Sequence, residues 1–209
     1  FALHRAASCF AAKQIRNVAT IGGNVAHCSP CADTMPPLLC HEAEALIAGG
    51  AGTRSLPVNQ VAAGPYRYGL TPDEVILGFY LRPRSPDFAD FQKIGRRREL
   101  VIARINMAGL ADVDGKGRLR EVRFALGSCT PVPQRFKQVE QMLEGQQPSE
   151  QLFWEAGALT AKIMIGITGM RPSFVYKEQA VQGLFYRMFA QMMRSVEPED
   201  LPTDHMDKQ

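Results

Sequence analysis

Two adjacent glycines and the polar residues around them have the clearest chemical potential in this sequence. Glycine has no Cβ, so the backbone N–H groups of Gly22 and Gly23 can turn toward an anion without obstruction. Thr20 and Asn24 add a hydroxyl and an amide as further donors. A glycine pair is also typical of an ordinary turn. The candidate phosphate cradle comprises Thr20, Ile21, Gly22, Gly23 and Asn24.

A carboxylate follows this cradle in a conformationally restricted segment. Asp33 lies a short way beyond Asn24 and precedes Pro36 and Pro37. Proline fixes its own φ and disfavours helix in the residue before it, so this segment is expected to be rigid and not helical. A lone aspartate is often a helix cap. A dinucleotide, however, could use both the cradle and the carboxylate, which could accept a hydrogen bond from a ribose or ribityl hydroxyl.

Composition excludes several classes of function. The chain has 209 residues, 45% hydrophobic and 22% charged, with a net charge of +3. That charge is too small to indicate nucleic-acid binding, and Arg96, Arg97 and Arg98 are expected to form a solvated loop. No apolar run is long enough to span a bilayer, and the first residues do not resemble a signal peptide. GxGxxG and Walker motifs are absent. These features predict a cytoplasmic protein.

The five cysteines are expected to be thiols, because their number is odd and no export signal is evident. Cys28, Cys31 and Cys40 could supply three ligands to an iron–sulfur cluster, although small buried thiols are the alternative. His27 and His41 have no nucleophile or second histidine at a diagnostic spacing. They are therefore expected to be ordinary surface or core residues.

The elements that would position the cradle come first in the chain. Residues 2–14 are rich in helix formers and predict one helix leading into the cradle. The glycine-rich turn at 49–52 predicts a hairpin of strands 43–48 and 53–58. A short helix is expected at 57–63 and a strand at 74–81. The stretch RPRSPD at 82–87 is the best linker candidate.

Beyond that linker, the pattern predicts an antiparallel meander followed by helices. Strands are expected at 91–94, 101–113 and 119–128, with a tight turn at 114–117. Apolar stripes predict three helices, beginning near Phe136, Ser149 and Ser173, and their methionines and aromatics are typical of a core. The chain therefore predicts an α+β fold, with a loose polar tail at 195–209.

Several motifs occur together in a fixed order: FAAKQIRNVATIGGN, SPCADTMPPLL, YRYGLTPDEVILGFYLRP, FQKIGRRREL and LGSCTPVPQR. They resemble the FAD-binding (medium) subunits of molybdenum hydroxylases, the family of xanthine dehydrogenase and carbon monoxide dehydrogenase. The resemblance implies the second half of a flavin-binding domain at 1–86. It also implies a C-terminal flavoprotein domain at 87–194, an antiparallel sheet packed with helices, before a flexible tail at 195–209.

The same resemblance assigns roles to single residues. It implies that residues 20–24 hold the FAD pyrophosphate and that Asp33 bonds the cofactor. Phe10 would contact the flavin or its adenosine portion, Ile76 would offer a backbone contact, and Lys93 would contact the cofactor. Without the resemblance, Phe10 and Ile76 would be assigned to the core and Lys93 to a solvated strand. The resemblance also implies that Tyr66 lies close to the edge of the flavin ring.

Partners follow from the resemblance as well. It implies FAD on this chain, with the molybdopterin cofactor on a large subunit and 2Fe–2S clusters on a small subunit. Electrons would pass from those clusters through FAD to NAD⁺ or another acceptor. Subunits of this kind normally carry a first glycine-rich loop ahead of these motifs, so another chain or a missing N-terminal part would supply the other half of the cradle. The alternative is a structural docking subunit that has lost FAD binding.

Overall fold

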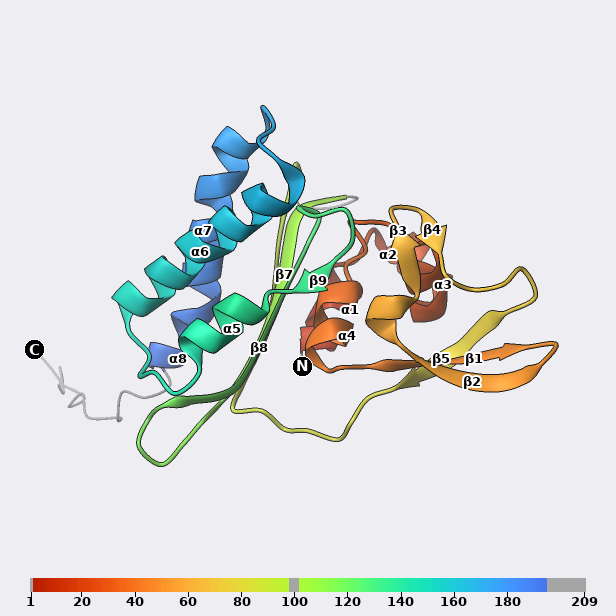
Figure 1. Cartoon of the computed structure of the whole chain (residues 1–209), viewed down its shortest axis with the longest axis horizontal. Coiled ribbons are helices and arrows are strands. Elements are labelled where there is room, and N and C mark those ends of the chain that lie inside the picture. The colour runs from red at the N-terminus through yellow and green to blue at the C-terminus, as the bar shows by residue number, and fades with distance from the viewer. Residues whose placement is uncertain (1, 98–101, 195–209) are drawn as a thin grey trace, which may run out of the picture.

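A four-stranded antiparallel sheet separates the two packed layers of the molecule (Figure 1). The computed structural model describes residues 2–97 and 102–194. The strand order is β6-β7-β8-β9. The bounds are Phe88–Gly95 for β6, Ala103–Val113 for β7, Leu119–Gly127 for β8 and Gln134–Arg135 for β9. The predicted meander is confirmed, although Val101 lies outside the described residues.

The long central strand β7 is buried on both faces. Successive side chains of a strand point to opposite sides of the sheet. Ile105 and Met107 accordingly belong to the apolar cluster on the C-terminal side, whereas Ala108 and Leu110 belong to the cluster on the N-terminal side. Two covered faces explain why β7 is an almost continuous apolar run.

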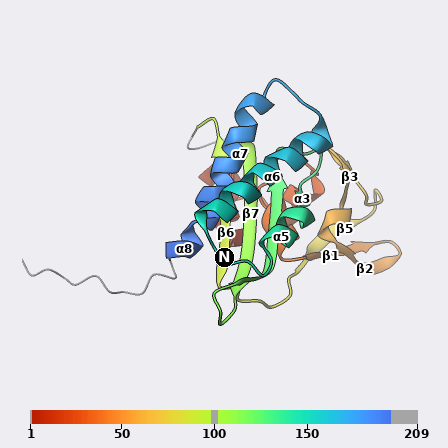
Figure 2. The ribbon, with the colours of Figure 1, turned by 60° about the vertical axis from the view of Figure 1, so that its left-hand side comes forward.

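The C-terminal helices cover one face of this sheet, as both views show (Figures 1 and 2). Ser149 caps the longest helix, because its hydroxyl accepts a hydrogen bond from the Leu152 N–H at 3.2 Å. The three predicted helices are confirmed, and a short fourth follows. None of the described helices is both long and apolar enough to cross a membrane. The bounds are Lys137–Leu143 for α5, Glu150–Thr168 for α6, Phe174–Phe189 for α7 and Gln191–Arg194 for α8.

The opposite face is covered by α1 (Ala2–Cys9) and α4 (Met35–Cys40). All six residues of α4 are buried. The expectation that Pro36 and Pro37 would prevent a helix here is wrong. Both prolines lie in the first turn, where a helix needs no N–H donor to an earlier carbonyl.

A second antiparallel sheet lies beyond this layer, with the strand order β2-β1-β5. Its strands are β1 (Glu44–Gly49), β2 (Gly52–Pro57) and β5 (Val75–Tyr80). The predicted hairpin and the predicted strand at 74–81 are therefore confirmed. The linker candidate keeps its irregular character, because residues 81–86 form neither helix nor strand.

Two local expectations in this half are wrong. The predicted helix at 57–63 is a single 3₁₀ turn, Val58–Gln60, followed by β3 (Ala62–Gly64), which pairs with β4 (Arg67–Tyr68). The predicted helix at 2–14 is broken after α1, because Ala11 has a positive φ of 42°. The chain then resumes as α2 (Lys13–Arg16).

An ion pair between β2 and the start of β5 predicts a specific acid sensitivity. The Glu74 carboxylate accepts hydrogen bonds from Arg54 Nε at 2.6 Å and from the Thr71 N–H at 2.9 Å. These bonds lower the pKa of Glu74 to about 2. A carboxylate with a lowered folded-state pKa stabilises the fold above its unfolded value, and this contribution is lost as the pH falls through the folded value.

We therefore expect Glu74→Gln to flatten the fall in stability between about pH 4.5 and pH 2. Urea unfolding midpoints measured across this range provide the test. The exposed Glu178 offers a matched control, and Glu178→Gln should follow the parent protein. Parallel curves for Glu74→Gln and the parent would contradict the assignment.

Candidate functional site

The predicted cradle is the beginning of a helix, α3 (Ile21–Ala26). Thr20 is its N-cap, and the Thr20 hydroxyl accepts a hydrogen bond from the Gly23 N–H at 2.9 Å. The alternative of an ordinary turn at the two glycines is thus wrong, and neither glycine has a positive φ. The N–H groups of Ile21 and Gly22 make no hydrogen bond to another described residue. They remain donors available to an anion.

Two hollows meet at the start of α3. One, of about 470 Å³, lies between α3 and β5, and the other, of about 220 Å³, lies between α3 and the end of α1. A Cβ added at Gly22 would lie 3.5 Å from the Ile76 carbonyl oxygen. This is an ordinary contact distance, so Gly22 faces β5 where both line the first hollow. The predicted residues that line these hollows are Phe10, Thr20, Ile21, Gly22, Asn24 and Ile76.

Asp33 and Lys93 form a nearly buried ion pair behind these hollows. Lys93 Nζ donates to Asp33 Oδ2 at 2.5 Å, and the two side chains are 8% and 4% exposed. Asn106 Nδ2 donates to the other carboxylate oxygen at 2.9 Å. Burial raises the pKa of Asp33, and Lys93 and Asn106 oppose part of that rise. The alternative of a solvated Lys93 is therefore wrong.

A third hollow, of about 960 Å³, begins beside this pair, and its charged lining residues are all positive. Lys93 lines it, so the ion pair lies between this hollow and the interior. The lining side chains with positive charge are Arg5, Lys13, Arg16, Lys93, Arg97 and Arg187.

Besides Asp33 and Lys93, two further predicted residues line neither of the hollows at α3. Gly23 uses its N–H in the helix cap. Tyr66 is 61% exposed, and its ring meets the His27 ring edge-on at 5.3 Å. No described contact links Tyr66 to the other predicted site residues.

The structure adds two residues that the sequence did not indicate. Thr34 donates its hydroxyl hydrogen to the Asn24 amide oxygen at 2.6 Å, which leaves the Asn24 NH₂ group as the donor to a ligand. Asn106 supports Asp33 from β7. The one available signal for Asn106 was an amide within the apolar run of a strand, and such a buried polar group requires partners.

The iron–sulfur hypothesis for Cys28, Cys31 and Cys40 is wrong. Cys40 is buried in the central core, donates to the Ala108 carbonyl oxygen at 3.4 Å and has its pKa raised to about 12 by burial. Cys28 instead approaches the Val61 carbonyl oxygen. Within residues 2–97 and 102–194, no three histidine, cysteine or acidic side chains are grouped so that they could hold a metal ion.

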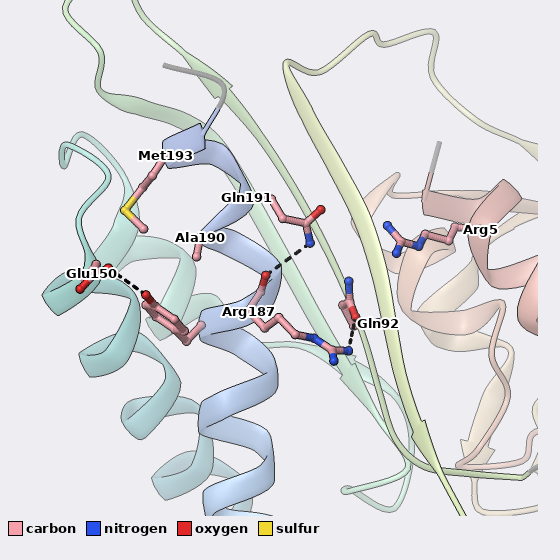
Figure 3. Close-up of a pocket in the computed structure, with 8 residues that line it drawn as sticks. Arg5, Gln92, Glu150, Arg187, Ala190, Gln191 and Met193 are labelled. Carbon is pink, nitrogen blue, oxygen red and sulfur yellow. Dashed lines mark hydrogen bonds between the residues drawn. The ribbon is translucent and has the colours of Figure 1, made fainter. Parts of the chain in front are cut away.

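A fourth hollow, of about 1060 Å³, lies at the edge of the central sheet (Figure 3). Arg187 reaches from α7 to the Gln92 side chain on β6, where its guanidinium donates at 2.6 Å. Arg5 of α1 pairs with Asp90 at 2.5 Å. None of the predicted cofactor residues lines this hollow. Its contacts connect α1 and α7 through β6.

Comparison with known proteins accounts for most of the chain. Residues 1–83 match the FAD binding domain in molybdopterin dehydrogenase, and residues 90–192 match the CO dehydrogenase flavoprotein C-terminal domain. The chain belongs to the molybdopterin dehydrogenase flavoproteins. The resemblance drawn from the sequence motifs is thereby confirmed.

Relatives of this flavoprotein family come from several dehydrogenases. The nicotinate dehydrogenase FAD-subunit of Eubacterium barkeri is 28% identical over 200 residues, which cover 94% of the chain and 68% of that subunit. The xanthine dehydrogenase FAD-binding subunit of Escherichia coli is 36% identical over 143 residues, covering 67% of the chain and 48% of the subunit. The chain thus spans about half to two thirds of these relatives.

A solved structure confirms the α+β fold. The carbon monoxide dehydrogenase from Hydrogenophaga pseudoflava, in a form that lacks the Mo-pyranopterin moiety of the molybdenum cofactor, matches with a TM-score of 0.81. The identity is 23%, and the match covers 92% of this chain and 67% of that chain.

Proposed function

We propose that this chain binds FAD as the flavoprotein component of a molybdenum hydroxylase. The observation that carries the proposal is the start of α3. Two N–H groups, of Ile21 and Gly22, are unused by the fold, and both residues line the first hollow. Adjacent free N–H groups can donate to phosphate oxygens, and residues 1–83 match an FAD binding domain, so the residues present fit the FAD pyrophosphate.

The neighbouring residues would hold the rest of the cofactor. Asn24 offers its NH₂ group, and Phe10 supplies an apolar wall in the smaller hollow. Ile76 bounds the larger hollow with its backbone and side chain. When bound, FAD would supply the electron-transfer chemistry of the site, while the protein positions the cofactor and sets its electrostatic surroundings.

Asp33 and Lys93 would act from behind this surface. Their ion pair holds the Lys93 ammonium at a fixed place between the interior and the cationic hollow. We place this positive charge near the flavin ring, where it would favour an electron-rich cofactor. Asp33 then contributes through Lys93 as well as through any direct bond to a cofactor hydroxyl.

The proposed assembly contains partners on other chains. We propose a large subunit with the molybdopterin cofactor and a small subunit with 2Fe–2S clusters, with electrons passing through FAD to NAD⁺ or another acceptor. Residues outside the 209 of this sequence would complete the pyrophosphate cradle. The proposed location is the cytoplasm.

The proposal predicts one FAD per chain in the purified complex. The measurement is the absorption spectrum of the complex, followed by quantification of the flavin released on heat denaturation. A yellow complex with flavin and chain in equal amounts is expected. A complex with its molybdenum subunit present but without flavin would contradict the proposal and favour the structural docking role.

A further inference from the structure

We propose that Asn106 is a positioning residue for the flavin site and that Gly127 provides the space it needs. Asn106 acts through Asp33, which it holds in the orientation that binds Lys93. The relevance to the cofactor rests on the proposed FAD function, whereas the positioning of the Asp33–Lys93 pair does not.

Strands β6, β7 and β8 of the central sheet place Lys93, Asn106 and Gly127 in one row. In the register of the sheet, Lys93 of β6 is paired with Asn106 of β7, and Asn106 is paired with Gly127 of β8. Directly opposed residues of antiparallel strands have neighbouring side chains on the same face. Lys93 and Asn106 both reach Asp33 from this row.

The Asn106 side chain is completely buried and has partners at both ends. Its Nδ2 donates to Asp33 Oδ1 at 2.9 Å and to the Ala32 carbonyl oxygen at 3.5 Å. Its Oδ1 accepts a hydrogen bond from the Ser128 hydroxyl at 3.3 Å. Rotation of the amide would leave several buried polar atoms without partners, so a single orientation is favoured.

Gly127 makes that orientation sterically possible. A Cβ at position 127 would lie 2.2 Å from Asn106 Oδ1 and 3.3 Å from Pro36 Cγ. Two such atoms cannot approach to 2.2 Å, so any side chain at 127 would displace the amide. Gly127 is not among the glycines with a positive φ. Space for Asn106, and not an unusual backbone conformation, therefore accounts for glycine at this position.

One carboxylate connects the row to the site. One carboxylate oxygen of Asp33 accepts a hydrogen bond from Asn106, and the other accepts one from Lys93. Without the bond from Asn106, the carboxylate could turn about its side-chain torsions, and the ammonium would keep only its longer hydrogen bond, of 3.4 Å, to the Cys9 carbonyl oxygen. Asn106 thus determines where the Lys93 charge lies without lining either hollow at α3.

The test compares Asn106→Ala and Gly127→Ala with the parent in the full flavoprotein chain. The first measurement is the rate at which acetic anhydride acetylates Lys93 in the FAD-free protein. Mass spectrometry quantifies the acetylated Lys93 over time. The second is the FAD dissociation constant together with the flavin midpoint potential. We expect acetylation to accelerate and FAD binding to weaken, each by about tenfold, the equivalent of one charge-assisted hydrogen bond. The midpoint potential should also shift.

Two control variants separate positioning from general loss of stability. Thr160→Val removes a buried hydroxyl that donates to the Ala156 carbonyl oxygen in α6, remote from Asp33. Gly166→Ala adds a Cβ that meets nothing within 4 Å. Neither control should change Lys93 acetylation or the potential. If Gly127→Ala does not fold, Asn106→Leu provides the second variant, because it keeps the approximate shape and removes the donor without adding a charge.

Each outcome is decisive. Unchanged Lys93 acetylation in folded Asn106→Ala would overturn the inference, and so would an equal increase in Thr160→Val. Faster acetylation confined to the Asn106 and Gly127 variants supports it. If that pattern appears in a parent protein that binds no FAD, the positioning of the ion pair stands and the proposed function fails.

Discussion

Replacing Lys93 with methionine is expected to destabilise the protein by about 3–5 kcal/mol, because it leaves a buried carboxylate without its cation. Lys93 Nζ lies 2.5 Å from Asp33 Oδ2. The two side chains are only 8% and 4% exposed, so water cannot easily replace the lost partner. Methionine retains the apolar stem of lysine, which limits the loss of packing. Urea unfolding at neutral pH gives the free-energy change.

The pH dependence of this loss has a defined sign. Burial already raises the pKa of Asp33, and removal of Lys93 takes away a group that opposes this rise. A carboxyl with a raised folded-state pKa stabilises the fold at low pH, and that contribution disappears as the pH rises through the folded value. The deficit of Lys93→Met should therefore shrink on acidification.

Two comparisons make the Lys93 result interpretable. Arg54→Met breaks the more exposed pair with Glu74, where water can replace the lost partner, and should destabilise the protein much less than Lys93→Met. Asp33→Asn combined with Lys93→Met removes both charges and should recover much of the lost stability. A Lys93→Met variant as stable as Arg54→Met would show that the buried pair contributes little.

Gly22→Val is expected to weaken FAD binding about a hundredfold, roughly 2.7 kcal/mol, while the chain remains folded. A Cβ at this position lies 3.5 Å from the Ile76 carbonyl oxygen and 3.7 Å from the Ile76 Cβ, which are ordinary contacts. The two additional methyl groups of valine would extend into the hollow or press against β5. Titration of FAD-free protein with FAD, followed by flavin fluorescence, measures the change.

Substitutions at other glycines test whether this effect is local. Gly183→Val adds the same side chain in α7, where a Cβ meets nothing within 4 Å, and should leave FAD affinity unchanged. Gly23→Val would bring its Cβ to 3.1 Å from the Thr20 hydroxyl and should weaken the helix cap more than it blocks the hollow. Parent-like affinity in Gly22→Val would remove the first hollow from the cofactor site.

The features that could be predicted from the sequence are those that depend on residues close together in the chain. The hairpin of β1 and β2 follows from the glycine-rich turn at 49–52, and the helix α6 follows from the Ser149 cap and its apolar stripe. The conformation of the segment predicted as the cradle could not be read in this way. Thr20 caps a helix that passes through both glycines, although two consecutive glycines lower helix propensity.

The parts that sequence could not supply depend on contacts between distant segments. Asp33 meets Lys93 60 positions later and Asn106 73 positions later. No spacing rule connects such residues, because their approach is produced by the fold of the sheet. Lys93 and Asp33 were singled out separately, and only the structure shows that they form an ion pair.

The burial of α4 bears on how such flavoproteins can diverge. Its six residues pack against β7 and β8, and the apolar cluster around them includes Phe91, Ala108 and Ala125 from beyond the irregular segment at 81–86. The two parts matched by separate family models thus share one interior. A chimaera that joined the first part of this chain to the second part of a distant relative would juxtapose side chains that had not evolved together. Exchange of these parts should succeed only when the α4 contacts are exchanged with them.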